Sequence, residues 1–489
     1  MGFKAALRGI MPLTTRNAEE RLSFLNASFV EQERRMAFLE SRLAEATAAL
    51  GEVARLVEEK GLAAQEDVRG LQGRLASVEE GICEIKAAQR YANAEYCQLR
   101  RSDAGSGQIL VVGWYGAQNL GDELMLKTLL AHFSDDMLQR TTVLLWDDER
   151  YPREEQDLRV RMLHYPRSTW NLELLADSFD VIVWGGGAIL DDRQFTDDPA
   201  NVNTGNLFIR LNELALARHK RVVCLGLSSN SAIEDARYVE RLSRIAEAAQ
   251  IFSIRDPHSL DALRRAGVRT EAMSLCQDIV FANAEAAALH RRARTQVEEG
   301  RFKLGVVPLF VGERTAPLAV ALDEACDALG WRAPELEVVL IPFLNEGGVD
   351  ALRCSEVRKR MKNRDRVRVA AYSEQGVLEE LASCDACVCY KYHAALLANL
   401  AGVPCLSVYS DEHPHYYNKM SYLAELFGCE SRLLSSSEFE KDPGGSLVDM
   451  LEDAEVPALP EGFLAECEAW LVEACAQIAE LASDGGSKR

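Results

Sequence analysis

The sequence lacks any uninterrupted run of the ~18–20 apolar residues that a helix needs to cross a bilayer. Residues 1–15 also lack the apolar block and cleavage site of a secretory signal. Basic residues are scarce: 55 Lys and Arg stand against 76 Asp and Glu, so the net charge is −21. Because binding to nucleic acid needs a basic face, this balance argues against a nucleic-acid-binding protein. Thirteen irregularly spaced cysteines are typical of reduced thiols. We expect a cytoplasmic protein, in solution or peripheral to the inner face of the membrane.

Proline is absent from residues 18–101, and aromatic residues are few there. Apolar residues recur at heptad spacing over 22–57 and resume, displaced by four positions, over 68–85. Such a stutter locally unwinds a supercoil without ending it. An amphipathic helix folded against the rest of the chain is the alternative, but sustained heptad spacing favours self-association. We therefore predict an N-terminal coiled coil over 1–101 and a homo-oligomer formed through it.

Beyond this segment, short apolar runs alternate with amphipathic helical stretches in two consecutive blocks. The expected strands are 108–113, 142–146, 181–184, 221–225 and 251–254, then 303–307, 337–341, 367–370, 386–389 and 405–408. Continuous apolar strands between helices indicate a parallel sheet covered on both faces. We predict an α/β fold with two Rossmann-like doubly wound domains, over 108–285 and 303–430, and an acidic linker with a C-terminal helix over 431–489. Ligands of such sheets bind at the carboxyl ends of the strands.

The loop after the first expected strand is rich in glycine and runs into a helix. It contains Asn119, Gly121 and Asp122. Glycines let the backbone approach a ligand, and a helix N-terminus offers unpaired N–H groups. Asp122 is either a functional carboxylate or a helix cap. A second loop holds three consecutive glycines, including Gly186 and Gly187, which are explained equally well by a close ligand or by a tight turn.

Three cations and one histidine complete the candidate site. Arg255 ends an expected strand, where it anchors a carboxylate or phosphate or forms a surface ion pair with the adjacent aspartate. Lys391 and His393 lie between a strand and a helix, and Lys419 follows further along the chain. A cation and a histidine at a helix N-terminus make an anion site with a proton donor.

No metal or cofactor is expected. Cys384, Cys387 and Cys389 alternate along a buried strand, where cysteine is an ordinary small apolar residue, and a structural zinc site needs four ligands. Asp191 and Asp192 start a polar loop, where turn and cap chemistry is the commoner role of aspartate.

These elements, in this order, resemble the polysaccharide pyruvyl transferase family over residues 108–428. The first loop is similar to the family's Gly-x-x-x-Asn-x-Gly-Asp-Glu, and 391–394 to its basic-x-His-Ala element. The resemblance implies a GT-B-like pair of Rossmann-like domains. It also implies transfer of the enolpyruvyl-derived unit of phosphoenolpyruvate to a sugar or glycan, free or lipid-linked, as a pyruvate ketal.

On this hypothesis Arg255, Lys391 and Lys419 neutralise the donor, His393 donates a proton, and Asp122 accepts one from a sugar hydroxyl. Lysine stands at 391 where the family has arginine, and residues 412–418 form an insertion. Two alternatives remain: a glycosyltransferase that uses a nucleotide-sugar in the same cleft, and a catalytically degenerate coiled-coil scaffold or sugar-binding protein.

Overall fold

The computed structural model describes most of the chain beyond the N-terminal segment. The described residues are Tyr96, 107–146, 159–166, 168–198, 201–202, 204–229, 232–291, 301–310, 315–330, 333–345, 348–411, 415–452 and 457–484. Apart from Tyr96, the predicted coiled coil lies outside them, so both the coiled coil and the oligomer stay predictions. The chain forms two compact units, and the one that comprises 103–165, 175–197 and 203–489 contains both sheets. None of the helices in the described part of the chain combines the length and apolar character that a membrane crossing requires.

The first sheet is parallel and has the strand order β3-β2-β1-β4-β6-β7-β8, with β5 beside β6. Its strands are β1 (Ile109–Val112), β2 (Thr141–Leu145), β3 (Arg161–His164), β4 (Val181–Trp184), β5 (Gly187–Leu190), β6 (Arg221–Ser229), β7 (Ile251–Ile254) and β8 (Ser274–Leu275). Strand β1 lies inside the sheet, between β2 and β4, and its four residues are buried. The order reverses direction between β1 and β4, which is the switch point where doubly wound sheets bind ligands.

The second sheet is also parallel and has the order β11-β10-β9-β12-β13-β14. Its strands are β9 (Arg301–Val307), β10 (Glu335–Leu340), β11 (Val367–Val369), β12 (Ala386–Cys389), β13 (Cys405–Tyr409) and β14 (Leu433–Ser435). If the strands are renumbered from β9 onward, the order is that of the dinucleotide-binding fold. The switch point of this sheet lies between β9 and β12. Strand β14 extends the sheet beyond residue 430.

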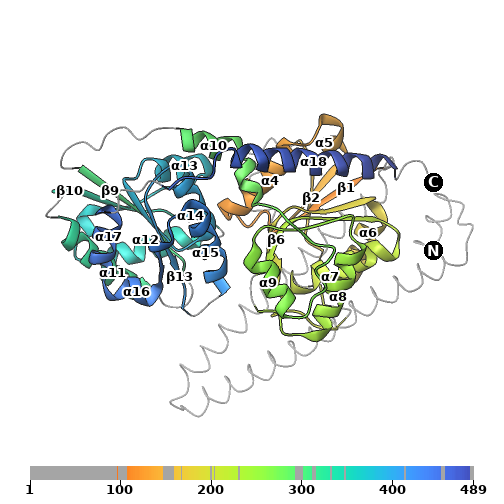
Figure 1. Cartoon of the computed structure of the whole chain (residues 1–489), viewed down its shortest axis with the longest axis horizontal. Helices are drawn as coiled ribbons and strands as arrows, with labels where there is room; N and C mark the ends of the chain where they lie inside the picture. Colours follow the sequence, from red (N-terminus) through yellow and green to blue (C-terminus); the bar gives the residue numbers. More distant parts are fainter. Residues whose placement is uncertain are drawn as a thin grey trace, which may run out of the picture. The chain divides into compact units, whose positions relative to one another are not determined.

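Helices cover both faces of each sheet, as labelled in Figure 1. They are α4 (Leu120–Ala131), α5 (Asp135–Arg140), α6 (Thr169–Ser178), α7 (Thr204–Ala217), α8 (Ala236–Ala248), α9 (Pro257–Arg265), η1 (Ile279–Ala282), α10 (Ala284–Arg291), α11 (Thr315–Gly330), α12 (Val349–Arg360), η3 (Arg364–Arg366), α13 (Glu374–Ala382), α14 (Tyr392–Leu400), α15 (His415–Phe427), η4 (Glu430–Arg432), α16 (Ser436–Lys441), α17 (Pro443–Glu452) and α18 (Phe463–Asp484). The C-terminal helix predicted from its apolar face is α18, which packs on η1 through Phe463 and Phe281, with ring centroids 5.1 Å apart.

The apolar strands have the two-sided burial expected of covered parallel sheets. In β12, Ala386 and Val388 enter one core, while Cys387 and Cys389 enter the other. Because successive side chains point to opposite faces, a strand that is buried on both faces must be apolar at every position. Each of the ten predicted runs overlaps a strand, which confirms the α/β class with two parallel sheets.

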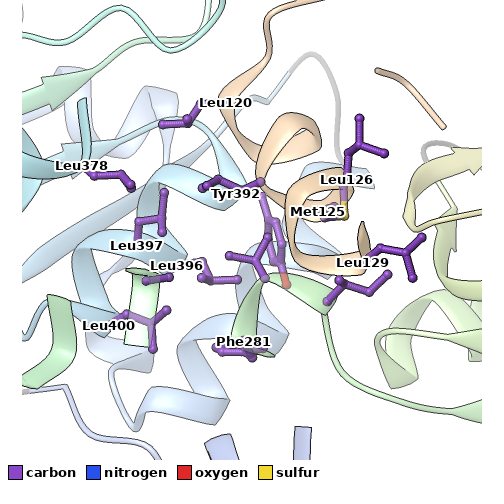
Figure 2. Close-up of a cluster of buried hydrophobic side chains, with 14 of the residues drawn as sticks. Leu120, Met125, Leu126, Leu129, Phe281, Leu378, Tyr392, Leu396, Leu397 and Leu400 are labelled. Carbon is purple, nitrogen blue, oxygen red and sulfur yellow. The ribbon is translucent and has the colours of Figure 1, made fainter. Parts of the chain in front are cut away.

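Helices α4 and α14, which follow the loops after β1 and β12, pack into one hydrophobic core. Helix α4 contributes Leu120, Met125, Leu126 and Leu129, and helix α14 contributes Tyr392, Leu396, Leu397 and Leu400 (Figure 2). All of these side chains are buried. The N-terminus of α4 and the N-terminus of α14 therefore lie close together, which brings the loop after β1 to the loop after β12.

Candidate active site

The loop between β1 and α4 is held by hydrogen bonds at both of its ends. The Glu123 carboxylate accepts from the backbone N–H groups of Gly116 (2.9 Å) and Gln118 (3.1 Å). The Gln118 carbonyl accepts from the Asn345 N–H (3.0 Å) and from the Tyr372 hydroxyl (3.0 Å). Gln118 has a φ of 55°, a conformation uncommon for a residue with a side chain. These contacts fix the backbone just before the candidate residues Asn119, Gly121 and Asp122.

Gly121 contacts His393 across the junction of α4 and α14. A Cβ atom at Gly121 would lie 1.9 Å from Nδ1 of His393 and 2.3 Å from its Cγ. Glycine is therefore required at this helical position by the close approach of the imidazole ring. His393 is 9% exposed, and its Nε2 lies 3.4 Å from Oδ2 of Asp278. The second domain thus presents the histidine to a carboxylate of the first domain.

Arg255 is buried and has two partners that fix its guanidinium. Its Nη1 donates to Oδ2 of Asp278 at 2.5 Å, and the guanidinium carbon lies 4.7 Å from the centroid of the Tyr392 ring. Burial opposes ionisation of Asp278, but Arg255 and His393 outweigh it and hold the pKa of this carboxyl below its usual range. The alternative of a surface ion pair with Asp256 is wrong, because Asp256 is buried and accepts from the Ser259 N–H at the start of α9.

Asp122 is a buried carboxylate in the first turn of α4. Its Oδ2 accepts from Nδ2 of Asn119 at 2.7 Å, and Asn119 itself occupies the N-cap position. Burial raises the pKa of Asp122 to about 6, although His393 and Arg255 pull it down. A carboxylate with this pKa is mostly ionised at pH 7 and still basic enough to accept a proton.

The two predicted glycines of the second loop lie against α4. Gly186 and Gly187 both have a φ of 101°, which only glycine adopts without strain. A Cβ atom at Gly187 would lie 3.5 Å from Oδ1 of Asp122. The positive φ angles, rather than contact with Asp122, therefore account for glycine at these two positions.

The two lysines differ in their surroundings. Nζ of Lys391 donates to Oδ2 of Asp350 at 2.6 Å, and the same oxygen accepts from the Leu344 N–H at 2.8 Å. Lys391 is also the N-cap residue of α14. Lys419 on α15 is 4% exposed, and burial together with the nearby Arg255 lowers its pKa to about 7.

A cavity of about 460 Å³ gathers most of the predicted residues. It is lined by Asn119, Asp122, Arg255, Lys391, His393 and Lys419, among others. Gly121, Gly186 and Gly187 are not among its lining residues, and their role towards a substrate stays a prediction. Trp114, Tyr165 and Trp184 form an aromatic part of the wall, and Trp114 stacks on Trp146 with ring centroids 4.6 Å apart. The cavity can hold a compact anion between cations, with a histidine and a carboxylate placed for proton transfer.

Three residues of this site, Asp350, Tyr392 and Trp114, could not be identified as site residues from the sequence. Asp350 lies 41 positions before Lys391, in the first turn of α12, and nothing in its local sequence marks it. Tyr392 looks like an ordinary apolar residue of a buried helix. Trp114 follows a glycine in the first loop, and its place in the cavity wall depends on how the loop folds.

Metal ligation finds no support in the described residues, where no three His, Cys, Asp or Glu side chains are grouped to hold an ion. Asp192 accepts from the backbone N–H groups of Glu234 and Asp235, both at 2.7 Å, and Asp191 pairs with Arg193 at 2.5 Å. These are the turn and cap roles predicted for the aspartate pair. Cys389 is fully buried in the hydrophobic core, and this burial raises the pKa of its thiol well above the ordinary value.

Two parallel, doubly wound sheets with a polar cavity at their switch points define the α/β fold of this chain. The sequence profile of the polysaccharide pyruvyl transferase family matches residues 119–412, more than half of the chain. The chain belongs to this family, which is one of transferases. No curated protein matches the sequence.

Several solved structures are similar to this chain in fold. HepE of Anabaena in complex with UDP-glucose is 14% identical, with coverage of 77% of this chain and 99% of that chain and a TM-score of 0.46. UDP-GlcNAc 2-epimerase of Neisseria meningitidis bound to UDP-GlcNAc is 9% identical, with 76% and 100% coverage and a TM-score of 0.47. A putative UDP-N-acetylglucosamine 2-epimerase of Listeria monocytogenes is 9% identical, with 79% and 98% coverage and a TM-score of 0.49.

Proposed function

We propose that this protein transfers the enolpyruvyl-derived unit of phosphoenolpyruvate to a sugar of a cell-surface polysaccharide or glycan, forming a pyruvate ketal. The observation that carries the proposal is the convergence of Arg255, Lys391, Lys419, His393 and Asp122 on one cavity. The donor is small and densely anionic, and its phosphate and carboxylate call for more than one cation. Family membership supports both the donor and the class of acceptor.

Donor binding falls to the three cations. Arg255 is held rigidly by Asp278 and Tyr392, so its guanidinium is preorganised and loses little freedom when an anion binds. Lys419 has a pKa of about 7 and is therefore only partly charged at neutral pH. A bound anion favours the charged ammonium, so Lys419 takes up a proton when the donor arrives.

His393 and Asp122 transfer the protons: His393 donates one, and Asp122 accepts one. His393 donates a proton to the terminal enol carbon, which becomes a methyl group and leaves an oxocarbenium-like centre at the neighbouring carbon. One sugar hydroxyl forms a bond to this centre and gives its proton to Asp122. A second hydroxyl of the same sugar then forms the other C–O bond, while the bond to phosphate breaks and the phosphate leaves with the second hydroxyl proton. The products are the cyclic ketal and inorganic phosphate.

The direct test measures phosphate release from phosphoenolpyruvate in the presence of candidate sugars. Arg255→Ala and His393→Ala should each abolish it. His132→Ala is the matched control, because His132 lies at the end of α4, is not among the described residues that line the cavity, and has its Nδ1 2.8 Å from the backbone carbonyl oxygen of Thr128 in its own helix. Unchanged turnover in Arg255→Ala or His393→Ala would overturn the assignment.

A thermal-shift measurement separates this proposal from a glycosyltransferase. A ligand that binds only the native state raises the apparent melting temperature. Phosphoenolpyruvate should stabilise the wild type and lose this effect in Arg255→Ala. Stabilisation by a nucleoside diphosphate, with none by phosphoenolpyruvate, would favour the nucleotide-sugar alternative. Binding of sugars without turnover, for every donor tried, would favour the scaffold alternative.

A further inference from the structure

A second cavity, of about 860 Å³, lies beside the candidate active site. Its wall includes Ser229 at the end of β6, Ser259 and Arg265 on α9, and Tyr417 and Asn418 on α15. One of these elements, α15, also contributes to the first cavity, because Lys419 directly follows Asn418. Arg255, which lines the first cavity, shortly precedes α9. A molecule that occupies both cavities would run along α15 and past the N-terminus of α9.

The sequence insertion over 412–418 contributes directly to this second cavity. Residues 415–418 form the first turn of α15, while 412–414 lie outside the described residues. Tyr417 packs edge-on against Tyr409, with ring centroids 5.1 Å apart and an interplanar angle of 72°. Both tyrosines line the cavity, and Tyr417 is 46% exposed. Tyrosine combines a broad apolar face with a polar hydroxyl, which suits a ligand such as a sugar ring that has apolar and polar surfaces.

The charge in the wall of the second cavity is opposite in sign to the net charge of the chain. Arg265 is the one charged residue among the described residues that line it, although the whole chain has a net charge of −21. Arg265 is exposed and forms no ion pair within the described part of the chain. Its neighbour Arg264, in contrast, donates to Asp261 (3.0 Å) and Thr270 (3.1 Å). A guanidinium without an ion-pair partner among the described residues, in the same cavity wall as two tyrosines, suits a carboxylate or phosphate carried by a carbohydrate.

We propose that the second cavity binds an acidic oligosaccharide, namely the units of the acceptor chain next to the sugar that is modified. Its role as an acceptor site rests on the proposed function. The reacting hydroxyls must enter the first cavity to reach the donor, and the units that follow must then pass over an adjacent surface. The second cavity is such a surface, since α15 contributes to both cavities and Arg255 of the first cavity shortly precedes α9, which lines the second. Tyr417 and Asn418, at the start of α15, thus belong to a recognition site for acidic glycans.

The test uses the full chain and an array of acidic and neutral oligosaccharides from bacterial surfaces. We expect the wild type to retain acidic oligosaccharides of two or more units in preference to neutral ones. Tyr417→Ala and Arg265→Glu should each weaken this binding by about tenfold, the scale of one lost aromatic or charged contact. Tyr417→Phe keeps the ring and should stay within about twofold of the wild type. Arg264→Glu is the matched control for charge and should bind like the wild type.

Affinity for phosphoenolpyruvate, measured on the same proteins, separates the two proposals. Tyr417 and Arg265 do not line the first cavity, so donor affinity should be equal in all variants. Oligosaccharide binding that is absent, that prefers neutral glycans, or that is the same in all variants would overturn the second site. Binding of acidic oligosaccharides through Tyr417 and Arg265, in a protein that neither binds phosphoenolpyruvate nor releases phosphate from it, would overturn the proposed reaction instead.

Discussion

Replacing Gly121 with alanine tests whether the close approach of α4 and α14 positions His393. The new Cβ atom would lie 1.9 Å from Nδ1 of His393, far inside van der Waals contact. Both helices belong to a packed core, so the ring can retreat only if α14 shifts, and overpacking of this kind costs about 1–3 kcal/mol. Alanine is favoured over glycine inside a helix by about 0.5–1 kcal/mol. We expect Gly121→Ala to lower the free energy of unfolding by about 1–2 kcal/mol.

A second substitution makes the prediction specific to this contact. His393→Ala removes Nδ1 and Cγ of residue 393, the two atoms nearest to the new Cβ, but keeps the Cβ atom that would lie 2.7 Å from it. In the His393→Ala background, Gly121→Ala should therefore lower the free energy of unfolding by about 1 kcal/mol less than in the wild type. The coupling between the two sites is then about 1 kcal/mol.

Urea unfolding followed by tryptophan fluorescence measures these free energies. Gly428→Ala is the control, because Gly428 has a φ of 63° and its Cβ would meet no atom within 4 Å. It should lower stability equally in both backgrounds. Additive effects of Gly121→Ala and His393→Ala would refute the proposed contact. Phosphate release gives a second readout, because a displacement of His393 by about 1 Å can reduce turnover by about 100-fold.

Two further predictions concern the charged groups. The value of kcat/KM for phosphoenolpyruvate should fall below pH 6, as Asp122 takes up a proton, and above pH 7, as Lys419 loses one. Lys419→Arg should remove the alkaline limb, because arginine stays charged; a limb that is unchanged in this variant would exclude Lys419 as its cause. Lys391→Ala should destabilise the protein by about 3 kcal/mol in urea unfolding, because it leaves the buried Asp350 carboxylate without its cation. Lys391→Arg should be tolerated and Asp350→Asn should rescue Lys391→Ala, whereas equal stability of Lys391→Ala and wild type would contradict this account.

The sequence predicted the central strands and one end strand, β11, but missed the other three end strands. Strands such as β4 and β12 lie inside a sheet and are covered on both faces, so every position is apolar. The missed strands β3, β8 and β14 lie at the ends of the strand orders, and β5 pairs with β6 alone. An edge strand has one unpaired side and is partly solvated, so its sequence contains polar residues such as Arg161 and Ser274. A search for continuous apolar runs therefore passes over it.

In the candidate site too, the local sequence predicts where a residue lies in its element, but not which distant residue it contacts. The placement of Arg255, Lys391 and His393 at one cavity was predictable because each lies just after a strand, and the carboxyl ends of parallel strands meet at one edge of a sheet. The contact of Gly121 with His393 was not predictable, since it depends on the distance between two helices of different domains. The pairing of Lys391 with Asp350 depends in the same way on where α12 packs.

These long-range partners decide how an anion can be bound. Arg255 and Lys391 already have buried carboxylate partners, Asp278 and Asp350, because a buried cation without a partner is costly to hold. The partners keep both cations charged and in place, but they also cancel part of the field that a donor would feel. Lys419 behaves differently, since burial brings its pKa to about 7 and its charge is not fixed at neutral pH. On this account the donor contacts two oriented cations whose charge is largely balanced by carboxylates. Its binding then favours the protonated form of Lys419, and the proton comes from the solvent. Binding of phosphoenolpyruvate above pH 7 should consequently consume protons, and calorimetry in buffers of different ionisation enthalpy would measure that uptake directly.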